Sequence, residues 1–455
     1  MVDFIEVIRR TENGPYISER DFDIEVVFET TRELVKKYGI RYNRNELITL
    51  NPEMADGAFQ AGLELAEKAG IFCINTSRQI KFNRAELLAA LRTAPRALQI
   101  GSGKDQRVIE AAEWGKRRKP FIWAGFSGAP LTEQTFRSSV RSYIKEPLVD
   151  ALGHGSLYCV DGIEVRSDSP LEVRATRQEL MYIREGLRRE GRPGMPFIGG
   201  ESSTTGLGDL AILNPDYLPE GAFHFVPTLN ELKINYRNLS RVIASLEYNV
   251  YNINLVDAII GGYAGGPEGA AVVTIAAFIL GLIVCDASVS LCHPAHNKWV
   301  STSPPQSVWA ENIVGQAFAR NSPLIIIGDV WTSAGTGTPD ILQEIAAISI
   351  TKSLTGNNPH GVGATNGKYP HGSGLDARWM AETALAAYDN QLSLERGNEI
   401  VCELVSRYEG KFPNPDLGKP YEEVYDTEKV LPLPWWQELY DENRRNFARD
   451  FDLKV

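Results

Sequence analysis

The feature that most constrains the fold of this chain is an alternation of short apolar runs and amphipathic helical patterns between about residues 97 and 370. Each run ends in glycine or polar residues, as in "MPFIGGESS" and "PLIIIGDVWTSAGTGTP". The runs are almost continuously apolar, which is typical of parallel strands covered on both faces. Eight or nine such units in about 270 residues favour a (β/α)8 TIM barrel.

A doubly wound open sheet of similar size is the alternative architecture. Its dinucleotide-binding form carries a GxGxxG motif after the first strand. No such motif follows the first predicted strand here, "ALQIGSGKD". The barrel is therefore the preferred interpretation.

Three regions are predicted along the chain: an N-terminal extension of helices and one hairpin at 1–95, the barrel domain at 96–390, and a C-terminal helical segment and tail at 391–455. The hairpin is "IFCINTSRQIKFN". The longest apolar stretch, 270–285, falls short of the roughly 20 residues that cross a membrane. It is predicted to be a buried helix running into a strand.

Composition excludes several functional classes. The net charge of −11 argues against general binding to nucleic acid or to a membrane surface. The five cysteines are scattered and include no CxxC pair, which indicates reduced thiols in a cytoplasmic protein. The first residues lack the pattern of a signal peptide.

In a barrel, the loops that follow the strands share one face, and active sites lie there. We expect this face to hold Lys104, Asp105, Ser127, Asp161, Glu201, His224, the loop 261–266, Asp286, His293, His296 and Asp329. The glycines at the strand ends permit close approach of the backbone to a large or flat ligand.

Taken singly, these residues name no reaction. The HPAH pair, His293 and His296, lacks a third ligand, so no metal site is expected. Glu201 fits a catalytic carboxylate and a loop cap about equally. His224 lies in an aromatic run, where a hydrogen-bonded core histidine is as reasonable as a catalytic one.

Several segments together resemble one known family. "GRPGM", "LNELKI", "GGYAGG" and "GLDARWMAETA" are similar to segments of monomethylamine methyltransferase, as are "KYGI", "GIFC", "GSGKD" and "SGAPLTE". That family moves a methyl group from methylamine to the cobalt of a corrinoid protein in methylotrophic methanogens. The resemblance implies a TIM barrel, a homohexamer, and a corrinoid (cobalamin) carried by a partner protein.

The family's characteristic electrophile, pyrrolysine, is where this chain departs from the pattern. The 33 residues at 196–228 match the family spacing without a gap, which puts pyrrolysine at Ile198, followed by the matching Glu201. The family's further acidic and amide side chains become Phe225, Leu255 and Asp329, while the position of His224 matches.

An isoleucine can form no adduct with an amine, and replacing carboxylates by apolar residues avoids unpaired buried charges. The resemblance therefore predicts a corrinoid-dependent methyltransferase whose donor needs no covalent capture, with a quaternary amine favoured. Ile198, Glu201, His224 and Asp329 are the predicted catalytic positions. The predicted substrate contacts are Phe225, Leu255, Tyr263 and Trp331, and the predicted corrinoid approach is Gly261, Gly262, Gly265 and Gly266.

Two alternatives stay open. One is demethylation of a methyl ether by the same route, with His224, Glu201 or Asp329 as general acid. The other is a non-catalytic partner or scaffold for the corrinoid protein, which a decayed site would also permit.

Overall fold

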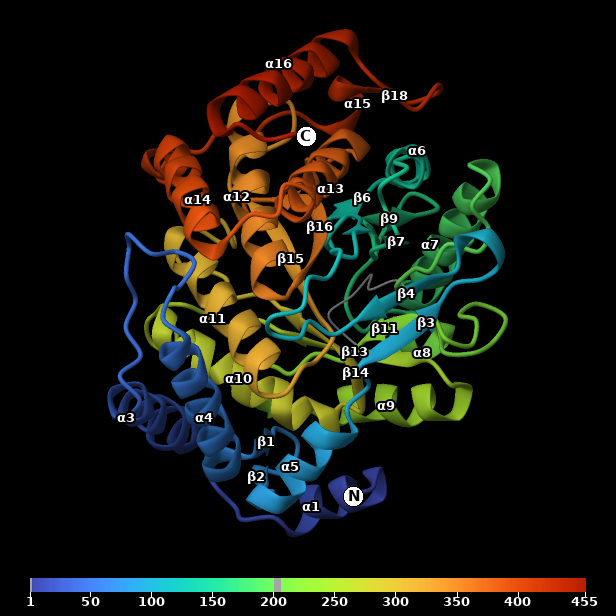
Figure 1. Cartoon of the computed structure of the whole chain (residues 1–455). Coiled ribbons are helices and arrows are strands. Elements are labelled where there is room, and N and C mark those ends of the chain that lie inside the picture. The colour runs from blue at the N-terminus through green and yellow to red at the C-terminus, as the bar shows by residue number, and fades with distance from the viewer. Residues whose placement is uncertain (1, 200–205) are drawn as a thin grey trace.

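The predicted βα units close into a parallel barrel in the computed structural model of the chain, which describes residues 2–199 and 206–455 (Figure 1). Seven strands follow the order β11-β13-β14-β15-β16-β5-β7. Parallel bridges from Leu152 to Phe197 and from Ile198 to Phe223 join the two outer strands of this sheet. The segment 197–198 thus supplies the eighth position of the ring, and the TIM barrel is confirmed.

The barrel strands are β5 (Trp123–Ala124), β7 (Ala151–Leu152), β11 (Phe223–Phe225), β13 (Tyr251–Val256), β14 (Ala287–Cys292), β15 (Ile326–Thr332) and β16 (Asn358–Thr365). The helices that follow them are α6 (Glu133–Ile144), α7 (Pro170–Arg189), α8 (Leu207–Ile212), α9 (Tyr236–Tyr248), α10 (Pro267–Val284), α11 (Pro305–Asn321), α12 (Pro339–Thr355) and α13 (Gly374–Asp389). Local signals set their ends. In α12 the Thr338 side chain caps the first turn, and Gly356 ends the helix in the left-handed conformation.

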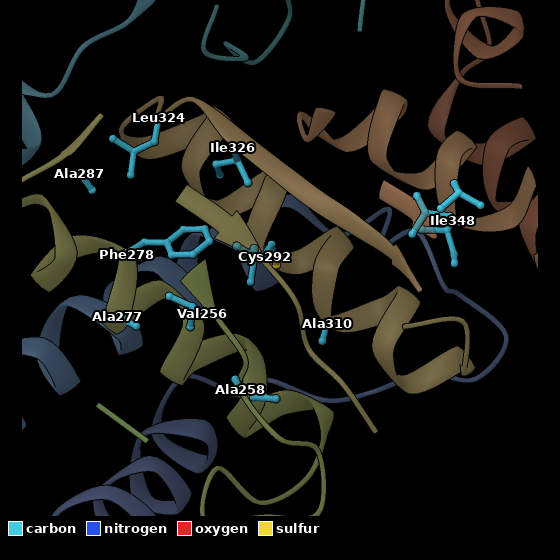
Figure 2. Packing of buried hydrophobic residues seen from close by; sticks show 14 of the residues in the cluster. Val256, Ala258, Ala277, Phe278, Ala287, Cys292, Ala310, Leu324, Ile326 and Ile348 are labelled. Atoms are coloured by element: carbon cyan, nitrogen blue, oxygen red, sulfur yellow. The ribbon is translucent and has the colours of Figure 1, made fainter. Parts of the chain in front are cut away.

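Two apolar layers hold the barrel together. One fills the space between strands and helices, where Phe278 of α10 and Cys292 of β14 meet (Figure 2). Gly281 brings α10 close to β13, because a Cβ there would lie 2.0 Å from Asn254 Nδ2. The second layer fills the barrel interior and includes Ile198 and Phe223.

Helix α10 is the predicted buried helix. It is long and apolar enough to cross a membrane by length and composition, but 83% of that stretch is buried inside the protein. Its burial against α4, α11 and β14 explains an apolar character on all faces.

The N-terminal extension packs against α10 and carries the predicted hairpin, β1 (Ile71–Cys73) with β2 (Arg78–Ile80). The other elements of the extension are α1 (Phe4–Asn13), α2 (Glu19–Asp21), a π-helical turn (Phe22–Glu29), α3 (Thr30–Lys37), α4 (Pro52–Ala69) and α5 (Arg84–Thr93). Strand β1 also pairs in parallel with β12 (Lys233–Ile234), which ties the extension to a barrel loop.

Residues 97–110 correct one prediction. They form the antiparallel hairpin of β3 (Ala97–Ile100) and β4 (Arg107–Glu110) and contribute no barrel strand. The hairpin covers the N-terminal end of the barrel, where Ser102 N donates to Gly194 O and Arg107 pairs with Asp150. Lys104 and Asp105 in its turn are therefore remote from the expected face.

The C-terminal segment packs on the outer helices. Trp436 of α16 (Pro434–Phe451) is fully buried and donates to Ser373 Oγ, so the tail lies against the barrel. The other elements here are α14 (Leu394–Tyr408), α15 (Tyr421–Val424), β17 (Tyr425–Asp426) and β18 (Leu431–Pro432). Short pairs also form in the barrel loops: β6 (Pro130–Leu131) with β8 (Ser156–Leu157), and β9 (Cys159–Val160) with β10 (Ile163–Glu164).

Candidate active site

A cavity of about 540 Å³ opens at the carboxyl ends of the barrel strands. This is the end where TIM-barrel enzymes place their active sites. The ionisable side chains in its described wall are His154, Arg237, Arg241, Asp257, His293, Asp329 and Lys368, and Ser127, Leu255 and Trp331 also line it.

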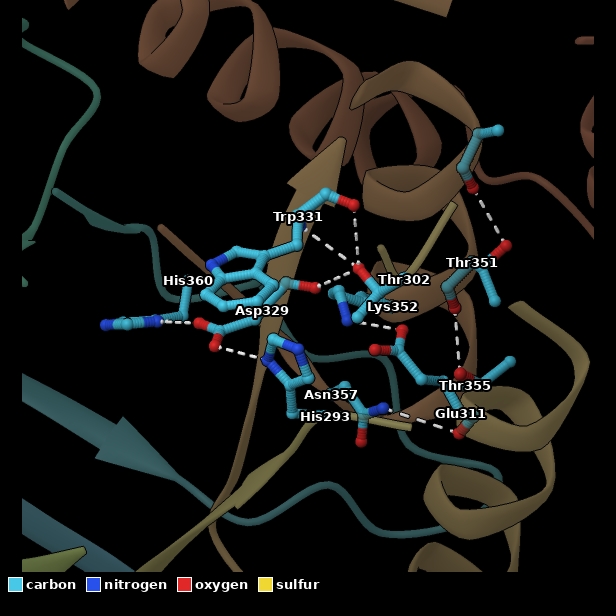
Figure 3. Close-up of polar contacts among 11 residues, drawn as sticks. His293, Thr302, Glu311, Asp329, Trp331, Thr351, Lys352, Thr355, Asn357 and His360 are labelled. Atoms are coloured by element: carbon cyan, nitrogen blue, oxygen red, sulfur yellow. Dashed lines mark hydrogen bonds and ion pairs between the residues drawn. The ribbon is translucent and has the colours of Figure 1, made fainter. Parts of the chain in front are cut away.

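Asp329 lies between two imidazoles in this cavity wall (Figure 3). Its Oδ2 lies 2.7 Å from His293 Nδ1, and its Oδ1 is hydrogen bonded to His360 Nδ1. Both carboxylate oxygens are thus used within the protein. His293 also lies 4.0 Å from Asp257 Oδ1, so a second carboxylate shares its charge.

Strand geometry aims these residues at the cavity. The register of β15 against β16 shifts between Val330 and Thr332, as in a bulge. Thr302 Oγ1 stabilises this irregularity by donating to Asp329 O and accepting from Trp331 N, both at 3.0 Å. The indole of Trp331 then meets the ring of His293 edge-on, with 4.4 Å between centroids.

The electrostatics of the cluster follow from these contacts. Burial alone would raise the pKa of Asp329, but the adjoining imidazoles outweigh it and hold that pKa well below its usual range. Burial would lower the pKa of His293, but the charges of Asp257 and Asp329 and the hydrogen bond to Asp329 raise it. The pair therefore favours an ionised Asp329 beside a protonated His293.

His154 and Asp257 complete the polar wall. Burial lowers the pKa of His154 to about 3, so its ring is neutral at physiological pH. That ring stacks parallel to His360 at 6.1 Å and meets Phe225 edge-on at 4.7 Å. Asp257 keeps 40% of its side-chain surface exposed, and burial of its remainder raises its pKa.

Several predicted site residues come together here. Leu255, Asp329 and Trp331 line the cavity. Ile198 is fully buried in the same interior cluster as Phe225, the side chain that touches His154. Glu201 lies outside the described residues, so its role stays a prediction.

His224 is not part of this assembly. Strand β11 alternates, so Phe223 and Phe225 face the barrel interior while His224 faces the outer layer. Its Nε2 lies 2.6 Å from Asn252 Oδ1, and burial with the nearby charge of Arg241 lowers its pKa to about 3. The structure gives it the environment of a hydrogen-bonded core histidine.

The predicted aromatic and glycine contacts after β13 also lie elsewhere. Tyr263, Gly261 and Gly262 line a surface hollow with Ile24 and Phe28 of the N-terminal extension. They sit on the rim of the barrel end, and none of them lines the cavity.

Two of the predicted acids, Asp286 and Asp161, lie away from the cavity. The two HPAH histidines have different partners. Asp286 precedes β14 and so lies at the opposite end of the barrel. Asp161 lies in the turn between β9 and β10 and pairs with Arg174 on the surface. His296 Nδ1 accepts from Lys298 N, while His293 faces Asp329.

Comparison with known proteins decides the family. The sequence model of "Monomethylamine methyltransferase MtmB" matches residues 2–450. Monomethylamine methyltransferase MtmB3 of Methanosarcina barkeri strain Fusaro is 31% identical over 444 residues, which cover 96% of this chain and 95% of the relative. The chain belongs to the monomethylamine methyltransferase MtmB family.

Other relatives agree. Monomethylamine methyltransferase MtmB2 of Methanosarcina acetivorans is 29% identical over 96% of this chain and 95% of its own length. The crystal structure of the Methanosarcina barkeri enzyme matches with a TM-score of 0.95 at 28% identity, covering 100% of this chain and 99% of that one. The predicted family is confirmed, and the chain is an enzyme of the methyltransferase class.

In this MtmB-family barrel, sequence reasoning missed three side chains. His360, His154 and Asp257 were not singled out as site residues. Asp257 directly follows the strand Tyr251–Val256. A carboxylate close behind an apolar run is the sequence signal that also singled out Asp329. His360 lies within a buried strand, where an imidazole between apolar neighbours calls for a partner.

Proposed function

We propose that this chain moves a methyl group from a small methylated amine, with a quaternary ammonium favoured, to the corrinoid of a cytoplasmic partner protein. Methyltransferases of the MtmB family work with a corrinoid partner, and family membership supports such a partner for this chain. The observation that carries the preference for a quaternary ammonium is a cavity with an available carboxylate at the barrel end, together with a hydrocarbon side chain in the barrel interior.

The hydrocarbon side chain is Ile198. On the register of the family resemblance it takes the place of pyrrolysine, and it is fully buried beside Phe223 in the barrel interior. A hydrocarbon side chain cannot capture an amine covalently. The donor must therefore release its methyl group without forming an adduct with the protein.

A quaternary ammonium meets this condition. When its carbon–nitrogen bond breaks, the electron pair stays on nitrogen, and the amine leaves neutral without needing a proton. The protein then has two tasks, which are to hold the cation in line with the acceptor and to keep water away. A buried cation needs a compensating charge nearby.

Asp257 is the carboxylate best placed for this purpose. It faces the cavity, and within the described chain no Lys or Arg nitrogen lies within 4.0 Å of it. The indole of Trp331 and the side chain of Leu255 add an aromatic face and an apolar wall. Asp329, the counter-ion expected from the sequence, instead accepts hydrogen bonds from two histidines and contributes at longer range.

The partner's reduced corrinoid supplies the nucleophile that accepts the methyl group. This chain contributes an open barrel end through which such a group can approach. Gly265 lies at that rim with φ +82°, and apart from its chain neighbours no atom of the described residues lies within 4 Å of where its Cβ would be. The role of the glycines 261–266 in corrinoid approach remains part of the proposal.

One observation favours a second donor class, the methyl ethers. An ether oxygen must take up a proton as its methyl group leaves, because an alkoxide is a poor leaving group. His293 lines the cavity, its pKa is raised, and it is held by an ionised Asp329, so it can donate that proton.

Two variants separate these donor classes. Asp257→Asn should weaken binding of tetramethylammonium by about tenfold while methoxyethanol is unaffected, since only the cation needs the charge. His293→Gln should depress turnover of the ether more than its binding. Asp161→Asn, a surface acid remote from the cavity, is the matched control.

Methyl transfer to the reduced corrinoid protein, followed by absorbance, gives the turnover, and calorimetry gives the binding. Indifference of tetramethylammonium binding to Asp257 would remove the quaternary-amine assignment. Absence of transfer from both donors, with an intact fold, would favour the non-catalytic partner.

A further inference from the structure

The described cavity wall carries a weakly paired carboxylate, Asp257, which lies 4.0 Å from His293 Nδ1, and a lysine, Lys368, on another wall. Asp257 follows β13, and Lys368 follows β16, three positions away around the eight-position ring. Within the described chain, Lys368 Nζ has no carboxylate within 4.0 Å and only faces the ring of Tyr369 at 5.3 Å. Asp257, whose neighbour His293 is bound more closely by Asp329, and Lys368 can thus each engage an opposite charge of a ligand in one cavity.

The other cations of the wall are already neutralised. Arg237 pairs with Asp168 at 2.9 Å, and Arg241 pairs with the buried Asp209 at 2.7 Å. Lys368 is therefore the cation that a ligand can engage at least cost, because a pair does not have to be broken first.

Two hydrogen-bond donors on the Lys368 side support the same conclusion. Ser127 Oγ, after the neighbouring strand β5, and Trp331 Nε1, near the end of β15, are buried without a hydrogen-bond partner in the part of the chain that the structure describes. Buried donors of this kind are usually satisfied by a ligand or by ordered water. An oxygen-bearing ligand group on this side would give them an acceptor.

Size points the same way. A cavity of about 540 Å³ falls within the range of roughly 300–1,000 Å³ that encloses ligands larger than a simple methylated amine. An amine without a tail would fill the region around Asp257 and leave the side near Lys368 empty.

We infer that the substrate is zwitterionic, with a carboxylate in addition to its methylated nitrogen. This inference rests on the proposed function and specifies its substrate class. The methylated nitrogen lies against Asp257 and the ring face of Trp331, and the carboxylate lies against Lys368, Ser127 Oγ and Trp331 Nε1. Lys368 is then a specificity-determining residue, because it selects donors by their tail.

The test compares three probes of equal length by calorimetry. Trimethylammonio-propanoate carries both charges. Propyltrimethylammonium carries the cation alone, and the carbon isostere of the zwitterion, with a quaternary carbon in place of nitrogen, carries the carboxylate alone. The native protein should bind the zwitterion about tenfold or more tightly than either single-charge probe, as expected of a charge-assisted hydrogen bond.

Lys368→Met should reduce zwitterion affinity to within about twofold of propyltrimethylammonium and leave the affinity for that cation unchanged. Lys298→Met, a surface lysine that faces Trp299 and does not line the cavity, should change neither. Equal binding of zwitterion and cation by the native protein, or equal weakening of both by Lys368→Met, would overturn the inference while leaving the proposed function intact. Failure of both quaternary probes to bind would instead overturn the proposed function.

Discussion

Two buried clusters of opposite charges flank strand β15, one sealed and one open (Figure 3). Gly328 faces the helices and Asp329 faces the barrel, because successive residues of a strand point to opposite faces. Outside, Lys352 of α12 pairs with Glu311 of α11, and both side chains are 0% exposed. Inside, Asp329 binds His293 and His360 beside the cavity.

The contrast shows how the same kind of pair serves different purposes. A Cβ at Gly328 would lie 2.5 Å from Lys352 Nζ, so the glycine leaves the space that the lysine occupies. Burial raises the pKa of Glu311 to about 7 despite the neighbouring ammonium, so neither member of this pair tolerates the loss of the other. The inner cluster keeps one side toward the cavity, where its charges can act on a ligand.

The largest expected effect is on the sealed pair. Lys352→Met should lower the free energy of unfolding by about 3–5 kcal/mol, because it leaves a buried carboxylate without its partner. Urea denaturation measures this loss, and adding Glu311→Leu should recover most of it. Methyl transfer per folded molecule should be unchanged. A loss of turnover without a loss of stability would show that the sealed pair acts in catalysis, like the open cluster.

Asp329→Asn should cost less stability, about 1–3 kcal/mol, with a characteristic pH dependence. The depressed pKa of Asp329 gives a contribution that is present above about pH 4 and lost as pH falls through the folded pKa. The raised pKa of His293 gives one that is complete below about pH 6.5 and lost as pH rises through the folded pKa.

The stability difference between the native protein and Asp329→Asn should therefore be largest between about pH 4 and 6.5 and shrink at higher pH. Thermal denaturation across that range provides the measurement. A difference that grows as pH rises above 7 would contradict a protonated His293 beside Asp329.

Trp331→Leu tests how the open cluster recognises a cation. Removing the indole should weaken tetramethylammonium binding by about three- to thirtyfold, as for the loss of a cation–π contact, with little change for methoxyethanol. Calorimetry with both ligands measures the two affinities. Equal losses would show that Trp331 shapes the cavity and does not recognise charge.

The smallest effect is expected at His224. His224→Gln keeps a donor for Asn252 on the outer face of β11, so donor binding and turnover should both stay within about twofold of native. Steady-state kinetics with the quaternary donor tests this. A selective fall in turnover would return His224 to the reacting centre, as the family resemblance had predicted.

The barrel was predictable because its signal is repeated: each apolar run followed by a helix adds to the same conclusion. The hairpin at 97–110 was not predictable, because a short apolar run before Gly101 has the same sequence pattern in a parallel as in an antiparallel strand. For β11, the periodicity of Phe223, His224 and Phe225 does not say which set faces inward, and a shift of one residue reverses every side chain.

Of the site, the sequence and its family resemblance predicted Leu255, Asp329 and Trp331 in the cavity wall and Ile198 near it. They did not predict the partners of Asp329, since His293 and His360 are brought to it only by barrel closure. The role of Asp257 could not be inferred either, because it depends on the oxygens of Asp329 being already engaged.

Methyl transfer from two donors decides whether a barrel with Ile198 in place of the family's electrophile acts on a donor that needs no covalent capture. Tetramethylammonium and monomethylamine are each supplied with the native protein and the reduced corrinoid partner, and methylation is followed by absorbance. We expect methylation from the quaternary donor and none at a useful rate from monomethylamine. Robust methylation from monomethylamine would contradict this expectation.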